Sequence, residues 1–124
     1  MVSRIEEAIQ KNLCSSSLTG KFPESLRSAI EYSVFPGGAR IRPTILISVA
    51  KACGDDMPEI TDAAASALEM IHCASLVHDD LPCFDNGDTR RGKPTVHKAY
   101  GENTAVLAGD SLIINAFNCL ASVS

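Results

Sequence analysis

A long apolar segment that ends in carboxylates is the feature that most restricts how this chain can fold. Residues 63–77 are mostly apolar and can form about four turns of a buried helix. Asp79 and Asp80 follow at once, where the helix macrodipole disfavours each negative charge by roughly 0.3–1 kcal/mol. Selection for stability alone would place Lys or Arg there. The sequence therefore predicts a bound cation at the end of this helix.

Charge is segregated along residues 78–94, because four carboxylates come first and three cations follow. The carboxylates are Asp79, Asp80, Asp85 and Asp88, and the cations are Arg90, Arg91 and Lys93. Mg²⁺ typically binds one or two carboxylates together with substrate phosphates. Arginine binds phosphate through two parallel hydrogen bonds. This arrangement predicts a magnesium–diphosphate site.

The predicted site requires a break in the helix. Asp79 and Asp85 are six residues apart, so an unbroken helix would place them on different faces. Pro82 disfavours such a helix and allows a local turn that brings Asp85 back toward Asp79. An EF-hand is excluded, since Pro82 and Phe84 would fall at ligand positions. A solvated turn at residues 86–87 with incidental charges is the alternative.

Two helical patterns upstream add candidate residues. Pro43 precedes an apolar run, and a helix N-terminus beside Arg40 and Arg42 is a natural anion site, although solvated arginines in a turn are the alternative. Farther along, residues spaced by three or four positions share one helix face. These residues are Leu68, His72, Ser75 and Asp79.

Three ordered motifs resemble those of the trans-isoprenyl diphosphate synthases. Residues 79–95 resemble their first aspartate-rich motif, residues 37–43 resemble their Gly-Gly-Lys-Arg-x-Arg-Pro motif, and residues 107–112 resemble a third landmark. The resemblance implies an all-α isoprenoid-synthase fold around a central cavity. The family's second aspartate-rich motif is absent after Asp110, so residues 1–124 are expected to be the N-terminal portion of a single helical prenyltransferase domain.

The resemblance also implies roles for individual residues. Asp79 and Asp85 would bind Mg²⁺ against an allylic diphosphate, with Asp80 as a further catalytic carboxylate and Arg90 binding the same diphosphate. The isopentenyl diphosphate would be bound by Arg42, His72 and Arg91. Ala39 stands where the family usually has a Lys that contacts this second substrate, so that contact is missing.

Product length is expected to depend on Ala74 and Ser75, about one turn before Asp79. In the family, a bulky aromatic side chain near this level tends to close the pocket early. Both residues are small here, which predicts geranylgeranyl diphosphate rather than farnesyl diphosphate as the product. A Phe at position 74 would then shorten the product.

The remaining patterns predict a helix from Ser3, with a Ser3–Glu6 capping box, to about Cys14, and another that begins at Pro23. Residues 15–21 are expected to be a polar linker. Further helices are expected at 44–53, 58–80 and 105–123, with a loop between the last two.

Composition excludes several classes of protein. A net charge of -4 with locally clustered basic residues argues against general nucleic-acid binding. Five cysteines without a CxxC spacing favour reduced thiols and a cytoplasmic protein. No apolar run is expected to reach membrane-spanning length, and the first residues are acidic, so membrane insertion is not expected. The resemblance implies a homodimer.

Three alternatives to a geranylgeranyl diphosphate synthase remain open. A farnesyl diphosphate synthase differs only in product length. A terpene synthase would share the first motif, but residues 37–43 and Arg91 argue against it because it needs no isopentenyl site. A non-catalytic subunit of a heteromeric prenyltransferase is favoured by Ala39 and opposed by the intact carboxylates.

Overall fold

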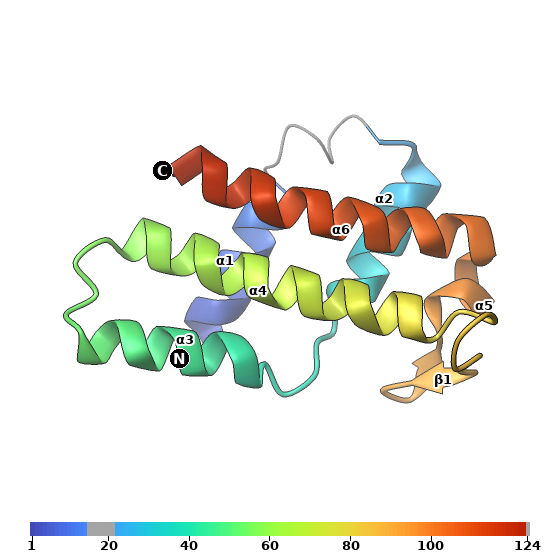
Figure 1. The fold of residues 1–124 in the computed structure, drawn as a ribbon, viewed down its shortest axis with the longest axis horizontal. Coiled ribbons are helices and arrows are strands. Elements are labelled where there is room, and N and C mark those ends of the chain that lie inside the picture. The colour runs from blue at the N-terminus through green and yellow to red at the C-terminus, as the bar shows by residue number, and fades with distance from the viewer. Residues whose placement is uncertain (15–21, 124) are drawn as a thin grey trace.

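The computed structural model describes residues 1–14 and 22–123, and these residues are mainly helical (Figure 1). Within this part of the chain the helices are α1 (Val2–Cys14), α2 (Glu24–Val34), α3 (Ile41–Ala52), α4 (Pro58–Asp79), α5 (Val96–Tyr100) and α6 (Glu102–Val123). A short hairpin of β1 (Thr89–Arg90) and β2 (Lys93–Pro94) lies between α4 and α5. The predicted all-α class is confirmed.

Helix α4 lies at the centre, with α3 on one side and α6 on the other (Figure 1). Helices α1 and α2 lie behind this layer in the same view and pack against α4 and α6. Helices α4 and α6 pack against each other, and both bury small side chains, which include Ala63, Ala67 and Ala74 on α4 and Ala105, Ala108 and Ala116 on α6. Larger apolar side chains from α1, α2 and α3 complete the core, each contributing roughly 1.5–3 kcal/mol by burial.

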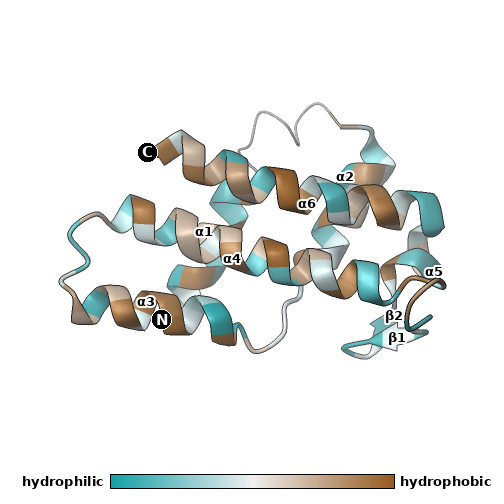
Figure 2. Ribbon diagram, viewed as in Figure 1, coloured by the Kyte–Doolittle hydropathy of each residue, from teal (hydrophilic) through white to brown (hydrophobic). Residues whose placement is uncertain are grey.

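Apolar side chains also remain exposed on the outer layer, which contains strongly hydrophobic stretches in α3, α4 and α6 (Figure 2). On α3 these are Ile41, Ile45 and Val49, and on α4 they are Ile60, Leu68 and Ile71. On α6 they include Leu107, Ile114 and Phe117. Exposed apolar patches of this kind mark surfaces that contact a ligand, another part of a protein or a partner.

Four predicted helix starts differ from the structure by one to three residues, and one of these is α6, which begins at Glu102 and not at residue 105. Helix α1 begins at Val2, so Ser3 lies inside it, and the Glu6 side chain binds Arg40 instead of closing a capping box. Helix α3 begins at Ile41, two residues before Pro43. Pro43 therefore lies in the first turn, where its missing backbone N–H costs no helical hydrogen bond. Pro23 is the N-cap of α2. The linker predicted for residues 15–21 lies outside the described residues.

The loop predicted between the last two helices is wrong in two places, because the structure has a hairpin at residues 89–94 and the short helix α5 at Val96–Tyr100. Thr89 pairs with Pro94 and Arg90 pairs with Lys93 in antiparallel register. The turn between them consists of Arg91 and Gly92, with φ of 55° and 78°. Positive φ at both positions is what a tight two-residue hairpin turn requires, and only glycine adopts it readily.

The expectation about membrane-spanning length is also corrected. Helices α4 and α6 are long and apolar enough to cross a membrane, judged by length and composition alone. Half of the relevant stretch of α4 and a third of that of α6 are buried against the other described elements. Core helices of soluble proteins meet the same criteria, so this finding is weak evidence for membrane insertion.

Candidate functional site

The loop that follows α4 brings Asp85 back to Asp79, as the sequence predicts. Helix α4 ends at Asp79, Pro82 lies in the turn that follows, and the Asp85 amide donates a hydrogen bond of 2.9 Å to the Asp79 carbonyl oxygen. The Asn86 amide donates a second one, of 3.0 Å, to the Leu81 carbonyl. The side chains of Asp79 and Asp85 are both exposed. Backbone hydrogen bonds therefore order this loop and leave two carboxylates available to a ligand.

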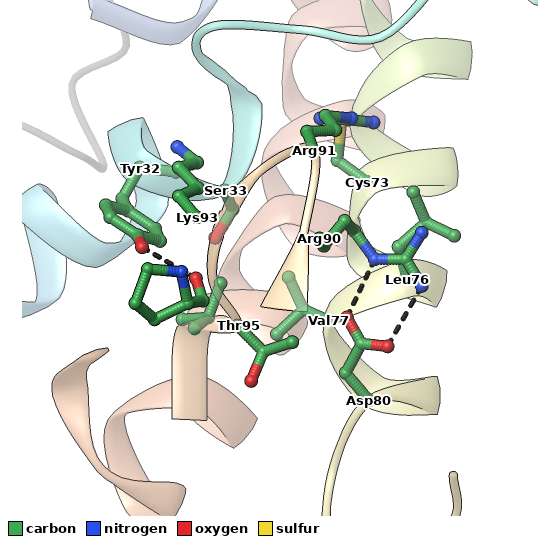
Figure 3. Close-up of a pocket in the computed structure, with 12 residues that line it drawn as sticks. Tyr32, Ser33, Cys73, Leu76, Val77, Asp80, Arg90, Arg91, Lys93 and Thr95 are labelled. Atoms are coloured by element: carbon green, nitrogen blue, oxygen red, sulfur yellow. Dashed lines mark hydrogen bonds and ion pairs between the residues drawn. The ribbon is translucent and has the colours of Figure 1, made fainter. Parts of the chain in front are cut away.

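Asp80 has a different environment from these two residues. It is 6% exposed and accepts two hydrogen bonds from Arg90, with distances of 2.8 Å to Nε and 2.9 Å to Nη2 (Figure 3). The Asp80 carboxylate raises the pKa of Arg90, mainly through these hydrogen bonds. The pair uses one edge of the Arg90 guanidinium, so the Nη1 donors stay available. Asp80 is thus placed to orient Arg90.

The donor set at this loop fits a divalent cation that also binds phosphate. Among the residues that the structure describes, no three His, Cys, Asp or Glu side chains form a ligand cluster. Asp79 and Asp85 each have an exposed carboxylate, and a hydrogen bond joins the backbones of the two residues. Mg²⁺ commonly takes one or two carboxylates and completes its octahedron with water and substrate phosphate.

A second polar site lies between the start of α3 and the middle of α4. A pocket of about 130 Å³ is lined by residues 38–42, Glu69, His72 and Arg91. Arg42 Nη1 lies 3.4 Å from His72 Nε2. The three residues predicted to bind isopentenyl diphosphate, Arg42, His72 and Arg91, therefore line one pocket. Their role in binding stays a prediction.

Electrostatics make this pocket suitable for an anion. Burial lowers the pKa of His72, and the neighbouring Arg42, Arg91 and Arg90 lower it further, against an opposing effect of Glu69. A neutral His72 can accept a hydrogen bond from Arg42. Two arginines without a paired carboxylate at hydrogen-bond distance then leave the pocket positively charged among the described residues.

Arg40 lies beside this pocket, but its side chain turns inward. Its guanidinium is 3% exposed and donates to both Glu6 oxygens, at 2.8 and 3.1 Å, and to Glu69 at 2.9 Å. A fourth hydrogen bond of 2.9 Å reaches the Val34 carbonyl oxygen. A Cβ at Gly37 would overlap the guanidinium, which explains the glycine there. Arg40 thus connects α1, α2 and α4, whereas Arg42 has no paired carboxylate among the described residues and lies beside His72 in the pocket.

An open, mainly apolar groove begins at Asp79. It has a volume of about 460 Å³ and is lined by Ile71, Ser75, His78, Asp79, Leu81, Phe84, Val106 and Ile113. Ser75, one of the two residues predicted to set product length, lines this groove. Ala74 is fully buried in the core. The structure therefore separates the two residues that the sequence treats together.

The sequence does not predict that Val106 and Ile113 of α6 form a wall of this groove. Val106 and Ile113 are seven residues apart, and this spacing of two helical turns is the signal that could have identified them. Gly109 lies between them, and a Cβ there would overlap the His78 ring, so glycine permits the close approach of α4 and α6 at this point. His78 Nε2 is 3.1 Å from the Val106 carbonyl oxygen and 3.4 Å from Asp110.

A model of the family described as Polyprenyl synthetase matches residues 23–124. The chain belongs to the polyprenyl synthetase family. It is 67% identical over 120 residues to a geranylgeranyl diphosphate synthase of Rhodobacter capsulatus, a match that covers 97% of this chain and 41% of that protein. It is 50% identical over 101 residues to a farnesyl diphosphate synthase of Geobacillus stearothermophilus, covering 82% of this chain and 34% of that protein.

The fold is similar to that of solved members of the family. The crystal structure of a geranyltranstransferase from Thermotoga maritima matches with a TM-score of 0.85 at 39% identity. That match covers 98% of this chain and 43% of the solved chain. The resemblance to the isoprenyl diphosphate synthases and to their helical fold is confirmed. The chain spans less than half the length of these relatives.

Proposed function

We propose that the protein containing this chain is a trans-prenyltransferase that condenses isopentenyl diphosphate with an allylic diphosphate and makes geranylgeranyl diphosphate. One observation carries the proposal: Arg90 and Arg91 are consecutive, yet one belongs to the carboxylate site and the other to the arginine pocket. Two diphosphates could therefore be bound next to each other. Relatives named geranylgeranyl diphosphate synthase, at 67% and 68% identity, support the same activity.

The carboxylate site is proposed to bind the allylic diphosphate. Asp79 and Asp85 would hold Mg²⁺, which supplies positive charge for the departing diphosphate when bound. Arg90 would donate to the same diphosphate from the edge that Asp80 does not use. Loss of this diphosphate breaks a carbon–oxygen bond and leaves an allylic cation.

The arginine pocket is proposed to bind isopentenyl diphosphate through Arg42, His72 and Arg91. The double bond of this substrate attacks the allylic cation, a carbon–carbon bond forms, and a proton is lost from the isopentenyl unit. Water would quench the cation, so apolar side chains such as Ile71, Val106 and Ile113 keep the reacting carbons dry. The groove that they line also offers space for the growing chain.

Product length and assembly complete the proposal. The small Ser75 leaves the groove open, which supports a geranylgeranyl product. A farnesyl product is the second candidate, supported by the 50% identical farnesyl diphosphate synthase.

Exposed Leu107, Ile114 and Phe117 on α6 support a homodimer. Free thiols at the four described cysteines, Cys53, Cys73, Cys83 and Cys119, are compatible with the proposed cytoplasmic location.

We further propose that residues 1–124 form the N-terminal portion of a larger helical domain, which suggests the decisive experiment. In a chimera, residues 1–124 replace the matching part of the Rhodobacter capsulatus relative, which is 67% identical to them. With Mg²⁺ and both substrates, the chimera is expected to make geranylgeranyl diphosphate. An inactive chimera beside an active parent would contradict the proposal and favour a non-catalytic subunit.

A further inference from the structure

Lys93, the third cation of the charged segment, does not point into either diphosphate site. Its Nζ donates hydrogen bonds of 2.9 Å to the Tyr32 carbonyl oxygen and 3.0 Å to the Phe35 carbonyl oxygen. The same atom lies 3.7 Å from the centroid of the Tyr32 ring. An ammonium has three donors, so carbonyls and an aromatic face use most of its binding capacity. Lys93 is bound to the end of α2.

The end of α2 is a favourable place for a cation. The last carbonyls of a helix lack partners within the helix and carry the negative end of its dipole. Burial lowers the pKa of Lys93, and the Arg91 cation lowers it further. The charge is therefore partly withdrawn from water, and the two carbonyls of residues 32 and 35 replace its hydration.

Tyr32 makes a second connection to the same strand. Its hydroxyl donates a hydrogen bond of 2.6 Å to the Pro94 carbonyl oxygen (Figure 3). Its ring meets the Tyr100 ring edge-on, with the ring centroids 5.3 Å apart. The cavity left between the hairpin and the helices beneath it is only about 30 Å³. The hairpin is thus seated on α2 and α4 with little free space beneath it.

This hairpin carries both arginines of the proposed substrate sites. Arg90 is paired with Lys93 across the ladder, and Arg91 occupies the turn. The two arginine side chains leave the hairpin in different directions, Arg90 toward Asp80 and Arg91 away from it (Figure 3). Arg91 instead passes Gly38, where a Cβ would lie 3.3 Å from its guanidinium. A shift of the hairpin would therefore move one arginine in each site.

We propose that Lys93 is a positioning residue that anchors the hairpin to α2 and thereby fixes Arg90 in the allylic diphosphate site and Arg91 in the isopentenyl diphosphate site. This inference rests on the proposed function for the identity of the two ligands. Lys93 acts on both substrates without touching either. A direct phosphate ligand would act on one substrate only.

Substitution in the chimera tests this inference. Lys93→Met keeps most of the side-chain length and removes both hydrogen bonds, and we expect the KM values of both diphosphates to rise about tenfold, since a small misplacement of a binding group is costly. The matched control is Lys98→Met, which removes the same charge from an exposed position whose partner is Asp88 at 3.4 Å. This control is expected to leave both KM values unchanged.

Double variants separate positioning from a general loss of structure. In an Arg91→Ala background, Lys93→Met is expected to raise the KM of the allylic substrate but not that of isopentenyl diphosphate. In an Arg90→Ala background the reverse is expected. An increase in both KM values in every background, or a change limited to one substrate in the single variant, would overturn the proposal.

Hydrogen exchange of the same proteins tests the anchor independently of turnover. Amides of residues 89–95 are expected to exchange faster in Lys93→Met than in Lys98→Met. Equal exchange would overturn the proposal even if the chimera is inactive. If the chimera is inactive but Lys93→Met speeds exchange, the proposed function is rejected and the anchoring role of Lys93 is kept. If the chimera is active and Lys93→Met leaves both KM values unchanged, only the anchoring role is rejected.

Discussion

The two polar sites are built in different ways. In the carboxylate loop, backbone hydrogen bonds fix the chain, and the side chains of Asp79 and Asp85 stay exposed without a paired cation among the described residues. In the arginine pocket, a buried ion-pair network around Arg40 supports the wall. The loop therefore leaves its carboxylates to solvent or to the proposed cation, whereas the pocket is held in place by contacts within the protein.

Chelation of Mg²⁺ gives the sharpest test of this comparison. We expect turnover by the chimera to fall at least about a thousandfold, because the charge on the departing diphosphate is no longer balanced. Binding of inorganic pyrophosphate to the arginine pocket, measured by calorimetry, is expected to persist. If both were lost together, the pocket would not be preformed.

Arg40→Met is expected to have the next largest effect. It leaves the buried Glu69 carboxylate without its partner, and breaking a buried pair in this way typically costs about 3–5 kcal/mol. Chemical unfolding of the chimera measures this loss. The matched control is Arg42→Met two residues away, which is exposed and should change the free energy of unfolding by less than about 0.5 kcal/mol while weakening isopentenyl diphosphate binding.

Ser75→Phe extends the comparison to the groove beside the carboxylate loop. The aromatic ring would fill the groove, so we expect product analysis of the chimera to show farnesyl in place of geranylgeranyl diphosphate. Ala74→Phe serves as the contrast, because overpacking a fully buried position costs about 1–3 kcal/mol of stability. A change of product in Ala74→Phe alone would show that Ala74 is the residue that limits chain length.

The smallest expected effect concerns pH. The pKa of His72 is lowered in the folded protein from its ordinary value of 6.5, so the unfolded chain binds this proton more readily. Stability from this residue is therefore present above pH 6.5 and is lost as the pH falls below it. Urea unfolding of the chimera between acidic and neutral pH is expected to show a shallower dependence in His72→Gln. If the free energy of unfolding depended on pH identically with and without His72→Gln, the pKa of His72 would not be lowered in the folded protein.

Local sequence signals predict much of the carboxylate site. Pro58 opens α4, and Pro82 lies in the turn that begins just after α4 ends at Asp79, because proline restricts the backbone next to it. The apolar pattern of residues 105–123 likewise predicts α6. These features follow from residues close together in the sequence, and so does the return of Asp85 to Asp79.

Features that depend on distant contacts are not predictable in this way. Lys93 in the hairpin binds the Tyr32 carbonyl oxygen of α2, about sixty residues earlier in the sequence. No local pattern predicts such a contact. Arg40 and Arg42 look equivalent in the sequence, and only Glu6 and Glu69 from other helices decide which one turns inward. The spacing of Ser3 and Glu6 predicts a helix cap, and this prediction is wrong because Glu6 binds Arg40, which is distant in the sequence.

The two-residue turn of the hairpin has a consequence for inhibitor chemistry. Arg90 and Arg91 are joined by one peptide unit, so their Cα atoms are about 3.8 Å apart and their backbone positions are coupled. A single molecule with two anionic ends, joined by a rigid spacer that matches the separation of the two guanidinium groups, could occupy both sites at once. Its affinity would then gain from bivalency, and lengthening the turn by one residue should abolish that gain.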